Sequence, residues 1–168
     1  MKSLRVNVLA APSKQKIEIT FSSEEEERCF LREIVNILSD QYVVSALVCD
    51  LDTDIDIYKN HFGSSPYLFF NDEPTHPTIA CSILDPHGID LAIDNWGYYT
   101  FDAFLYWTER GIAFSEKSKG KEGLAYVNDS ILTIRQVLDY SLEIHVSGSV
   151  LVELWPMFLK WINTPELP

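Results

Sequence analysis

The feature of this sequence best suited to chemistry is a row of four aspartates at alternate positions. They follow an apolar run and are separated by single residues: Asp50, Asp52, Asp54 and Asp56. Because side chains alternate along a strand, a strand here places all four carboxylates on one face, each about 6.5 to 7 Å from the next. Like charges at that spacing persist in water, beside a cation or against a basic surface. The row therefore indicates a solvated strand, a partner-binding face or a metal site.

Calcium is the first metal to consider, since an EF-hand loop also begins with acids at alternate positions. That loop requires glycine at its sixth position and a bidentate glutamate at its twelfth. Counting from Asp50 gives isoleucine and histidine at those positions, which excludes an EF-hand. A metal-dependent hydrolase that uses Asp50 and Asp52 with His76 or His87 stays open, because both histidines lie in predicted turns near acids.

Other catalytic signatures are missing from the sequence. It has no Gly-x-Ser-x-Gly elbow, no His-Glu-x-x-His pair and no glycine loop that precedes a helix and could hold a phosphate. Its three cysteines are far apart among apolar neighbours, which indicates buried thiols and no disulfide framework: Cys29, Cys49 and Cys81. We therefore expect a binding protein rather than an enzyme, with no cofactor.

The acidity of the chain is concentrated in its middle. Of 25 acids and 13 bases, residues 33–109 hold 13 acids and one base, so this segment carries the whole net charge of -12. Such a charge repels nucleic acid and anionic lipid headgroups, which argues against direct binding to either. No apolar run approaches the roughly 20 residues that span a bilayer, and no signal peptide is visible, so we expect a cytoplasmic protein.

The elements that would position these residues begin with strands. Alternating apolar residues predict an N-terminal hairpin, and Ser23 followed by acids predicts the start of a helix with Phe30 and Ile34 on its buried side. The run at 42–49 predicts a strand that continues through the aspartate row to residue 57. Three further strands are expected at residues 67–70, 78–84 and 89–93, joined by turns at 71–74 and 85–88 into an antiparallel meander.

The second half of the sequence is more helical in character. A short helix is expected at residues 101–109, a loop at 115–123, and two helices at 131–146 and 150–162, the first of which carries His145. The β-branched residues of 144–152 leave a strand as an alternative there. The sequence thus predicts one α+β domain over residues 1–168, with a mostly antiparallel sheet, an N-terminal hairpin, one helix after it and a helical C-terminal segment.

These features favour a small acidic inhibitor of the immunity type, which binds and neutralises a basic toxin. Size, acidity, an α+β fold and the lack of a catalytic motif are typical of bacterial immunity proteins, and a nuclease toxin needs a basic surface to hold phosphates. Aromatic residues beside acids in a turn are candidate anchors for such a partner. The predicted partner-binding residues are Asp50, Asp52, Asp54, Asp56, Asp72, Glu73, Asp90, Asp94, Trp96 and Tyr98. A phosphate-mimicking inhibitor of DNA-binding enzymes is a further alternative, and the oligomeric state is left open.

Overall fold

The protein folds into a layer of helices against one antiparallel sheet. The computed structural model describes residues 3–8, 14–38, 40–51, 55–69, 78–96, 103–109, 130–137 and 140–163. The strands within them are β1 (Ser3–Val8), β2 (Lys14–Thr20), β3 (Tyr42–Leu51), β4 (Tyr67–Phe69), β5 (Thr78–Ile83), β6 (Ala103–Glu109), β7 (Leu132–Val137) and β8 (Ser141–Ser147). The helices are α1 (Glu24–Leu38), α2 (Ile55–Phe62), α3 (Pro86–Asp94) and α5 (Gly148–Asn163).

These eight described strands join in the order β1-β2-β8-β7-β6-β3-β5-β4, and each neighbouring pair is antiparallel. The predicted α+β class with an antiparallel sheet, an N-terminal hairpin and a C-terminal helix is confirmed. Among the described helices, none is long and apolar enough to cross a bilayer.

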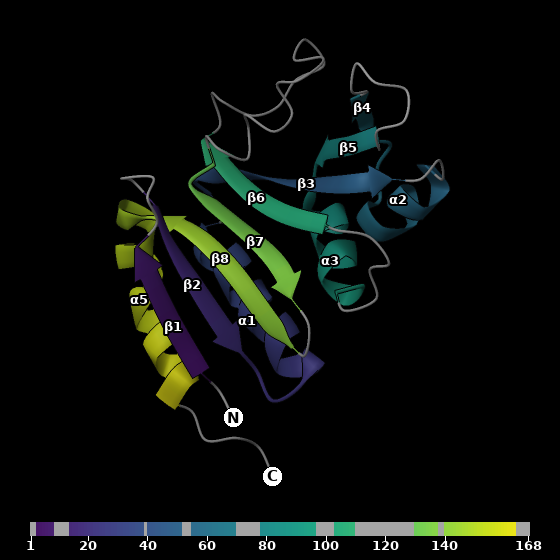
Figure 1. Cartoon of the computed structure of the whole chain (residues 1–168). Coiled ribbons are helices and arrows are strands. Elements are labelled where there is room, and N and C mark those ends of the chain that lie inside the picture. The colour runs from purple at the N-terminus through teal and green to yellow at the C-terminus, as the bar shows by residue number, and fades with distance from the viewer. Residues whose placement is uncertain are drawn as a thin grey trace.

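All four described helices cover the same face of the sheet (Figure 1). The core lies between the two layers, because alternate residues of the strands face the helices. Ile17 of β2 stands opposite Ile144 of β8, and both are buried with Phe30 of α1 and Phe158 of α5. Phe30 and Phe158 stack with ring centroids 5.5 Å apart. One apolar cluster therefore joins the sheet to its helices.

Helix α1 begins as its sequence predicts. Ser23 accepts a hydrogen bond from the backbone N–H of Glu26 at 3.3 Å, and the Glu26 carboxylate accepts from the backbone N–H of Ser22 at 3.1 Å. The bond from Glu26 satisfies an N–H group that the first turn of a helix leaves without a partner, and the bond from Ser22 ties the residue before the cap to the helix. Apolar residues three and four apart, including the predicted Phe30 and Ile34, then form its buried face.

The strand expected at residues 89–93 is wrong, because this segment lies in helix α3. Asp85 caps that helix: its carboxylate accepts a hydrogen bond from the backbone N–H of Gly88 at 2.7 Å. Pro86 follows in the first turn, where its missing N–H costs nothing. The residues interpreted as a turn are therefore the start of a helix.

The helices expected at residues 101–109 and 131–146 are also wrong. The first segment forms strand β6, and the second forms strands β7 and β8, which pair with each other around Tyr140. Tyr140 has a φ of 60°, a left-handed conformation that turns the chain between the two strands. His145 consequently lies on β8 rather than on a helix. The two predicted helices thus supply three of the central strands.

The aspartate row does not lie on one strand. Strand β3 ends at Leu51 and helix α2 begins at Ile55, so Asp50 belongs to the strand and Asp56 to the first turn of the helix. An acid in the first turn interacts favourably with the positive end of the helix dipole. The predicted face of four carboxylates on a single strand is therefore wrong.

Candidate binding surface

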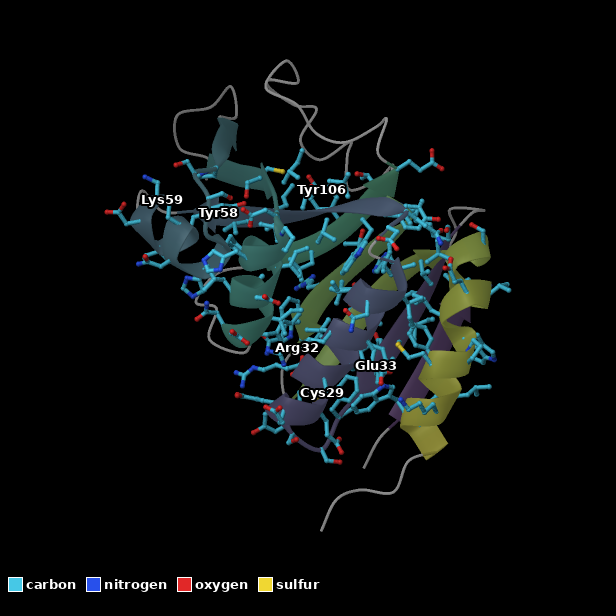
Figure 2. The ribbon with its side chains drawn as sticks, turned by 180° about the vertical axis from the view of Figure 1, so that it is seen from behind. Cys29, Arg32, Glu33, Tyr58, Lys59 and Tyr106 are labelled. Carbon is cyan, nitrogen blue, oxygen red and sulfur yellow. The ribbon has the colours of Figure 1, made fainter. Side chains whose placement is uncertain are left out.

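The exposed acids of α2 and α3, together with the Asp85 cap of α3, form what we call the acidic helix surface: Asp56, Asp85, Asp90 and Asp94. The two helices are adjacent, because Gly88 of α3 approaches the backbone of Phe62 at the end of α2. Lys59 is the one lysine or arginine on these two helices, and it points away from the sheet while Tyr58 points toward it (Figure 2). The surface therefore has a negative excess.

Two of these acids stand where they disfavour their own helix. Asp90 and Asp94 are four residues apart in the second half of α3, whose last turn contains no basic residue. Like charges at this spacing repel, and acids near a helix C-terminus oppose the dipole. Arg32 of α1 forms an ion pair with Asp94 and offsets part of this cost.

Trp96, predicted to be an anchor for a partner, is buried. Only 1% of its surface is exposed, and its indole N–H donates a hydrogen bond to Oε1 of Glu27 at 2.9 Å. The Trp96 carbonyl in turn accepts from the guanidinium of Arg28 at 2.8 Å. These contacts fix the end of α3 against α1, so the prediction that Trp96 contacts a partner is wrong.

Glu27 is a buried carboxyl group with unusual titration. It is completely buried, and its second oxygen, Oε2, has no hydrogen-bond partner among the described residues. Burial raises its pKa to about 7, and the negative charge of Glu24 raises it too, against the lowering effects of Trp96 and Arg28. The sequence contains a signal for this burial, because Glu27 continues the apolar spacing of Phe30 and Ile34. Neither Glu27 nor Arg32 was among the residues predicted from the sequence.

Several predicted site residues lie outside the described ranges or have side chains that do. The first group is Asp52, Asp54, Asp72, Glu73, His76 and Tyr98, and the second is Asp50, whose backbone alone is described. From the predicted set, the structure places Asp56 on α2 and Asp90 and Asp94 on α3, two helices that lie side by side. It adds Asp85, which we had assigned to a turn.

The metal-hydrolase alternative gains nothing from the described residues. Within those ranges, no three His, Cys, Asp or Glu side chains lie close enough together to hold a metal ion. His87 is exposed on α3. Its proposed ligand partners Asp50 and Asp52 are among the residues whose side chains are not described.

The described cysteines do not favour a role as catalytic nucleophiles. Cys81 is buried, and its sulfur lies 2.8 Å from the Tyr106 hydroxyl. Burial raises the pKa of Cys81 to about 12, an effect that the Tyr106 hydrogen bond only partly offsets. A thiol that stays protonated is a poor nucleophile. Cys29 is half-buried rather than buried, which differs from our expectation for it.

The sheet face away from the helices is balanced in charge along β2 and β8. Lys16 lies 3.1 Å from Glu18 and 3.5 Å from Glu143. Glu143 also accepts a hydrogen bond at 2.8 Å from His145. Burial raises the pKa of Glu143, but the contacts with His145 and Lys16 outweigh it and lower the pKa overall. Each of these two carboxylates has a basic partner, so this part of the sheet face carries no comparable negative excess.

Comparisons with protein-family models, with curated proteins and with solved structures find no match to this chain. The acidic helix surface is therefore judged on its own geometry and charge.

Proposed function

We propose that this protein binds a basic protein partner through the acidic helix surface and neutralises it, as an immunity-type inhibitor does a nuclease toxin. One observation carries the proposal: Asp90 and Asp94 are placed on α3 where repulsion and the helix dipole both disfavour them. Residues that violate local rules at a cost to stability are expected at functional sites. A basic partner would place further cations beside these acids.

Charge arrangement supports the same proposal. The open sheet face carries acids paired with Lys16 and His145. The acidic helix surface has four exposed acids against Lys59 and the Arg32 that pairs with Asp94. Complementary surfaces accelerate association about 10- to 1,000-fold and disfavour acidic partners. A nuclease covered at its phosphate-binding surface would lose access to nucleic acid. The mechanism is therefore occlusion, and it requires no catalytic residue.

The test begins with co-purification of the partner from the protein's own cells, followed by measured affinity at several salt concentrations. The double variant Asp56→Asn/Asp90→Asn should bind about 2- to 30-fold more weakly, because each exposed charge pair contributes about 0.2–1 kcal/mol. The dependence of its affinity on salt should also be shallower.

A matched control removes two charges elsewhere. Asp40 and Glu109 are exposed near the opposite end of β3 from α2, so Asp40→Asn/Glu109→Gln changes net charge equally away from the proposed surface. Equal losses in both double variants would remove the acidic helix surface from the interface. Inhibition of several unrelated DNA-binding enzymes would instead indicate a phosphate mimic, since an immunity protein is selective.

A further inference from the structure

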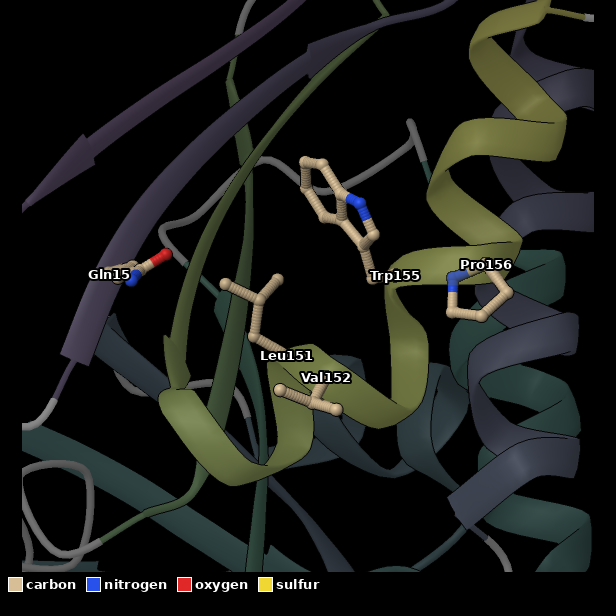
Figure 3. Close-up of a pocket in the computed structure, with 5 residues that line it drawn as sticks. All are labelled: Gln15, Leu151, Val152, Trp155 and Pro156. Atoms are coloured by element: carbon tan, nitrogen blue, oxygen red, sulfur yellow. The ribbon is translucent and has the colours of Figure 1, made fainter.

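The outward side of α5 carries apolar residues that its own fold does not cover. Val152 is 76% exposed and Leu159 is 41% exposed, with Pro156 exposed between them. Beside them lies a groove of about 420 Å³, whose lining is almost entirely apolar (Figure 3). Gln15 of β2 forms one side of it, and Leu151, Val152, Trp155 and Pro156 form the other. Exposed apolar residues beside a groove make this side of α5 a candidate interaction surface.

The residues on this side of α5 divide into two flanks. At 100° per residue, Val152 and Leu159 fall on one side of Pro156, and Glu153 and Lys160 fall on the other. The polar flank lies toward α1, because Glu153 accepts a hydrogen bond from Gln41 at 3.3 Å and Lys160 pairs with Glu33 of α1 at 2.8 Å. The apolar flank therefore lies toward the groove and β2.

We propose that two copies of this chain pair through α5, with the two helices antiparallel about a two-fold axis near Pro156. In antiparallel packing, each flank of a helix meets the same flank of its partner. The apolar flanks then bring Val152 against Leu159 of the second copy. The polar flanks bring Glu153 against Lys160 of the second copy, and by symmetry the reverse. A two-fold interface must be self-complementary. The charges of Glu153 and Lys160 meet this requirement, because each faces its opposite on the second copy.

A parallel arrangement lacks that complementarity. It would set the polar flank of one helix against the apolar flank of the other, so Glu153 and Lys160 would face Val152 and Leu159. Charged groups would then lose water without gaining a partner, which is unfavourable. The sequence of α5 thus selects an antiparallel second copy as the occupant.

The surrounding structure is compatible with this interface. Among the described strands, β1 is at the end of the sheet, and Figures 1 and 2 both place α5 at that same end. Stable dimers bury about 800 Å² on each partner, more than one helix flank supplies, and the outer edge of β1, the last of the described strands, lies at the same end of the sheet as α5. The acidic helix surface lies at the other end (Figure 1). The dimer, which is independent of the proposed function, would present two such surfaces.

The first experiment measures molecular mass by light scattering and sedimentation from about 1 to 100 µM chain. The mass should rise toward twice that of the 19.2 kDa chain. Val152→Asp should raise the dimer dissociation constant at least about tenfold, as expected for an acid placed in an apolar interface. Because Val152 is mostly exposed within one chain, circular dichroism should show an unchanged fold. Ile57→Asp, at a partly exposed residue of α2, is the matched control and should dimerise normally.

A charge swap tests the antiparallel arrangement itself. Glu153→Lys and Lys160→Glu should each weaken the dimer, and the double variant should restore its dissociation constant to within about twofold. Rescue is the diagnostic result, because Lys160→Glu also removes the pair with Glu33 inside the chain. A chain that is monomeric throughout overturns the proposal and leaves the groove to a different occupant. A dimer indifferent to Val152→Asp, or a swap without rescue, overturns it as well.

Discussion

The buried carboxyl of Glu27 makes the stability of this protein sensitive to pH in a way that one substitution should remove. Glu27→Gln keeps an oxygen that accepts the Trp96 indole N–H, now 2.9 Å away, and replaces the carboxylate by a neutral group of the same shape. The variant should be more stable than the parent protein at pH 8. The gain should shrink as the pH falls.

The magnitude follows from the two pKa values. The folded protein holds Glu27 at a pKa of about 7, against its ordinary value of 4.5 in the unfolded chain. The folded state thus binds more protons between these values, so stability is full below 4.5 and falls as the pH rises to 7. The linkage relation gives a cost of about 1 kcal/mol at pH 5.5 and about 3 kcal/mol at pH 8. The difference between variant and parent should therefore widen by about 2 kcal/mol.

Urea denaturation followed by tryptophan fluorescence at pH 5.5, 6.5, 7.5 and 8 measures this difference directly. Other titrating groups are common to both proteins and cancel. Glu25→Gln is the matched control, because it removes the same charge from an exposed residue in the same turn of α1. If the stability difference between Glu27→Gln and the parent does not change with pH, then Glu27 does not titrate in this window. The account of a buried, neutral carboxyl would then be refuted.

Two further predictions concern packing and buried hydroxyls. A Cβ on Gly88 would lie 2.6 Å from the carbonyl oxygen of Phe62, so Gly88→Ala should lose about 1–3 kcal/mol in thermal unfolding despite the better helix propensity of alanine. An unchanged melting temperature would contradict the close approach of α2 and α3. Thr108 is buried with an unpartnered hydroxyl among the described residues, so Thr108→Val should be neutral or stabilising by up to about 1 kcal/mol. Thr133→Val should lose about 1 kcal/mol instead, because Thr133 bonds Ser130 at 2.7 Å, and equal losses would count against this reasoning.

Local signals in the sequence were sufficient to predict an element where they agreed with its packing in the folded protein. Ser23 and Glu26 predict the start of α1, and the spacing of Phe30 and Ile34 predicts its buried face, because cap and core are both encoded within a few residues. The hairpin of β1 and β2 is predictable from the sequence for the same reason. Ile17 and Ile19 alternate with polar residues because only one face of β2 is buried against the helices.

Strand β6 could not be recognised in this way. Leu105 and Trp107 face the helices, yet Tyr106 and Thr108 on the opposite face are equally buried. A strand buried on both faces has a continuous apolar sequence without the period of two, which is compatible with a helix. Its position between β3 and β7 in the middle of the sheet is decided by residues distant in sequence.

Strand β8 is different, because its period was present and was missed. Leu142, Ile144 and Val146 are buried and alternate with half-buried polar residues, as expected for a strand with one open face. The turn before β8 could not be predicted from the local sequence, because Tyr140 adopts a positive φ that is usual for glycine or asparagine. Without that turn, residues 131–146 look like a single helix.

The candidate surface depends on the same distinction between helix and strand. Asp90 and Asp94 share a face in either conformation, but a strand would separate them by about 13 Å and a helix by about 6 Å. In α3 they form a compact pair of charges, where the predicted strand would have formed an extended row. The basic partner that we propose would therefore need cations that lie close together, as adjacent arginines of a phosphate-binding surface do. The sequence shows that the excess of acids lies within residues 33–109. The helical spacing of Asp90 and Asp94 on α3 sets how far apart two cations that pair with them can lie.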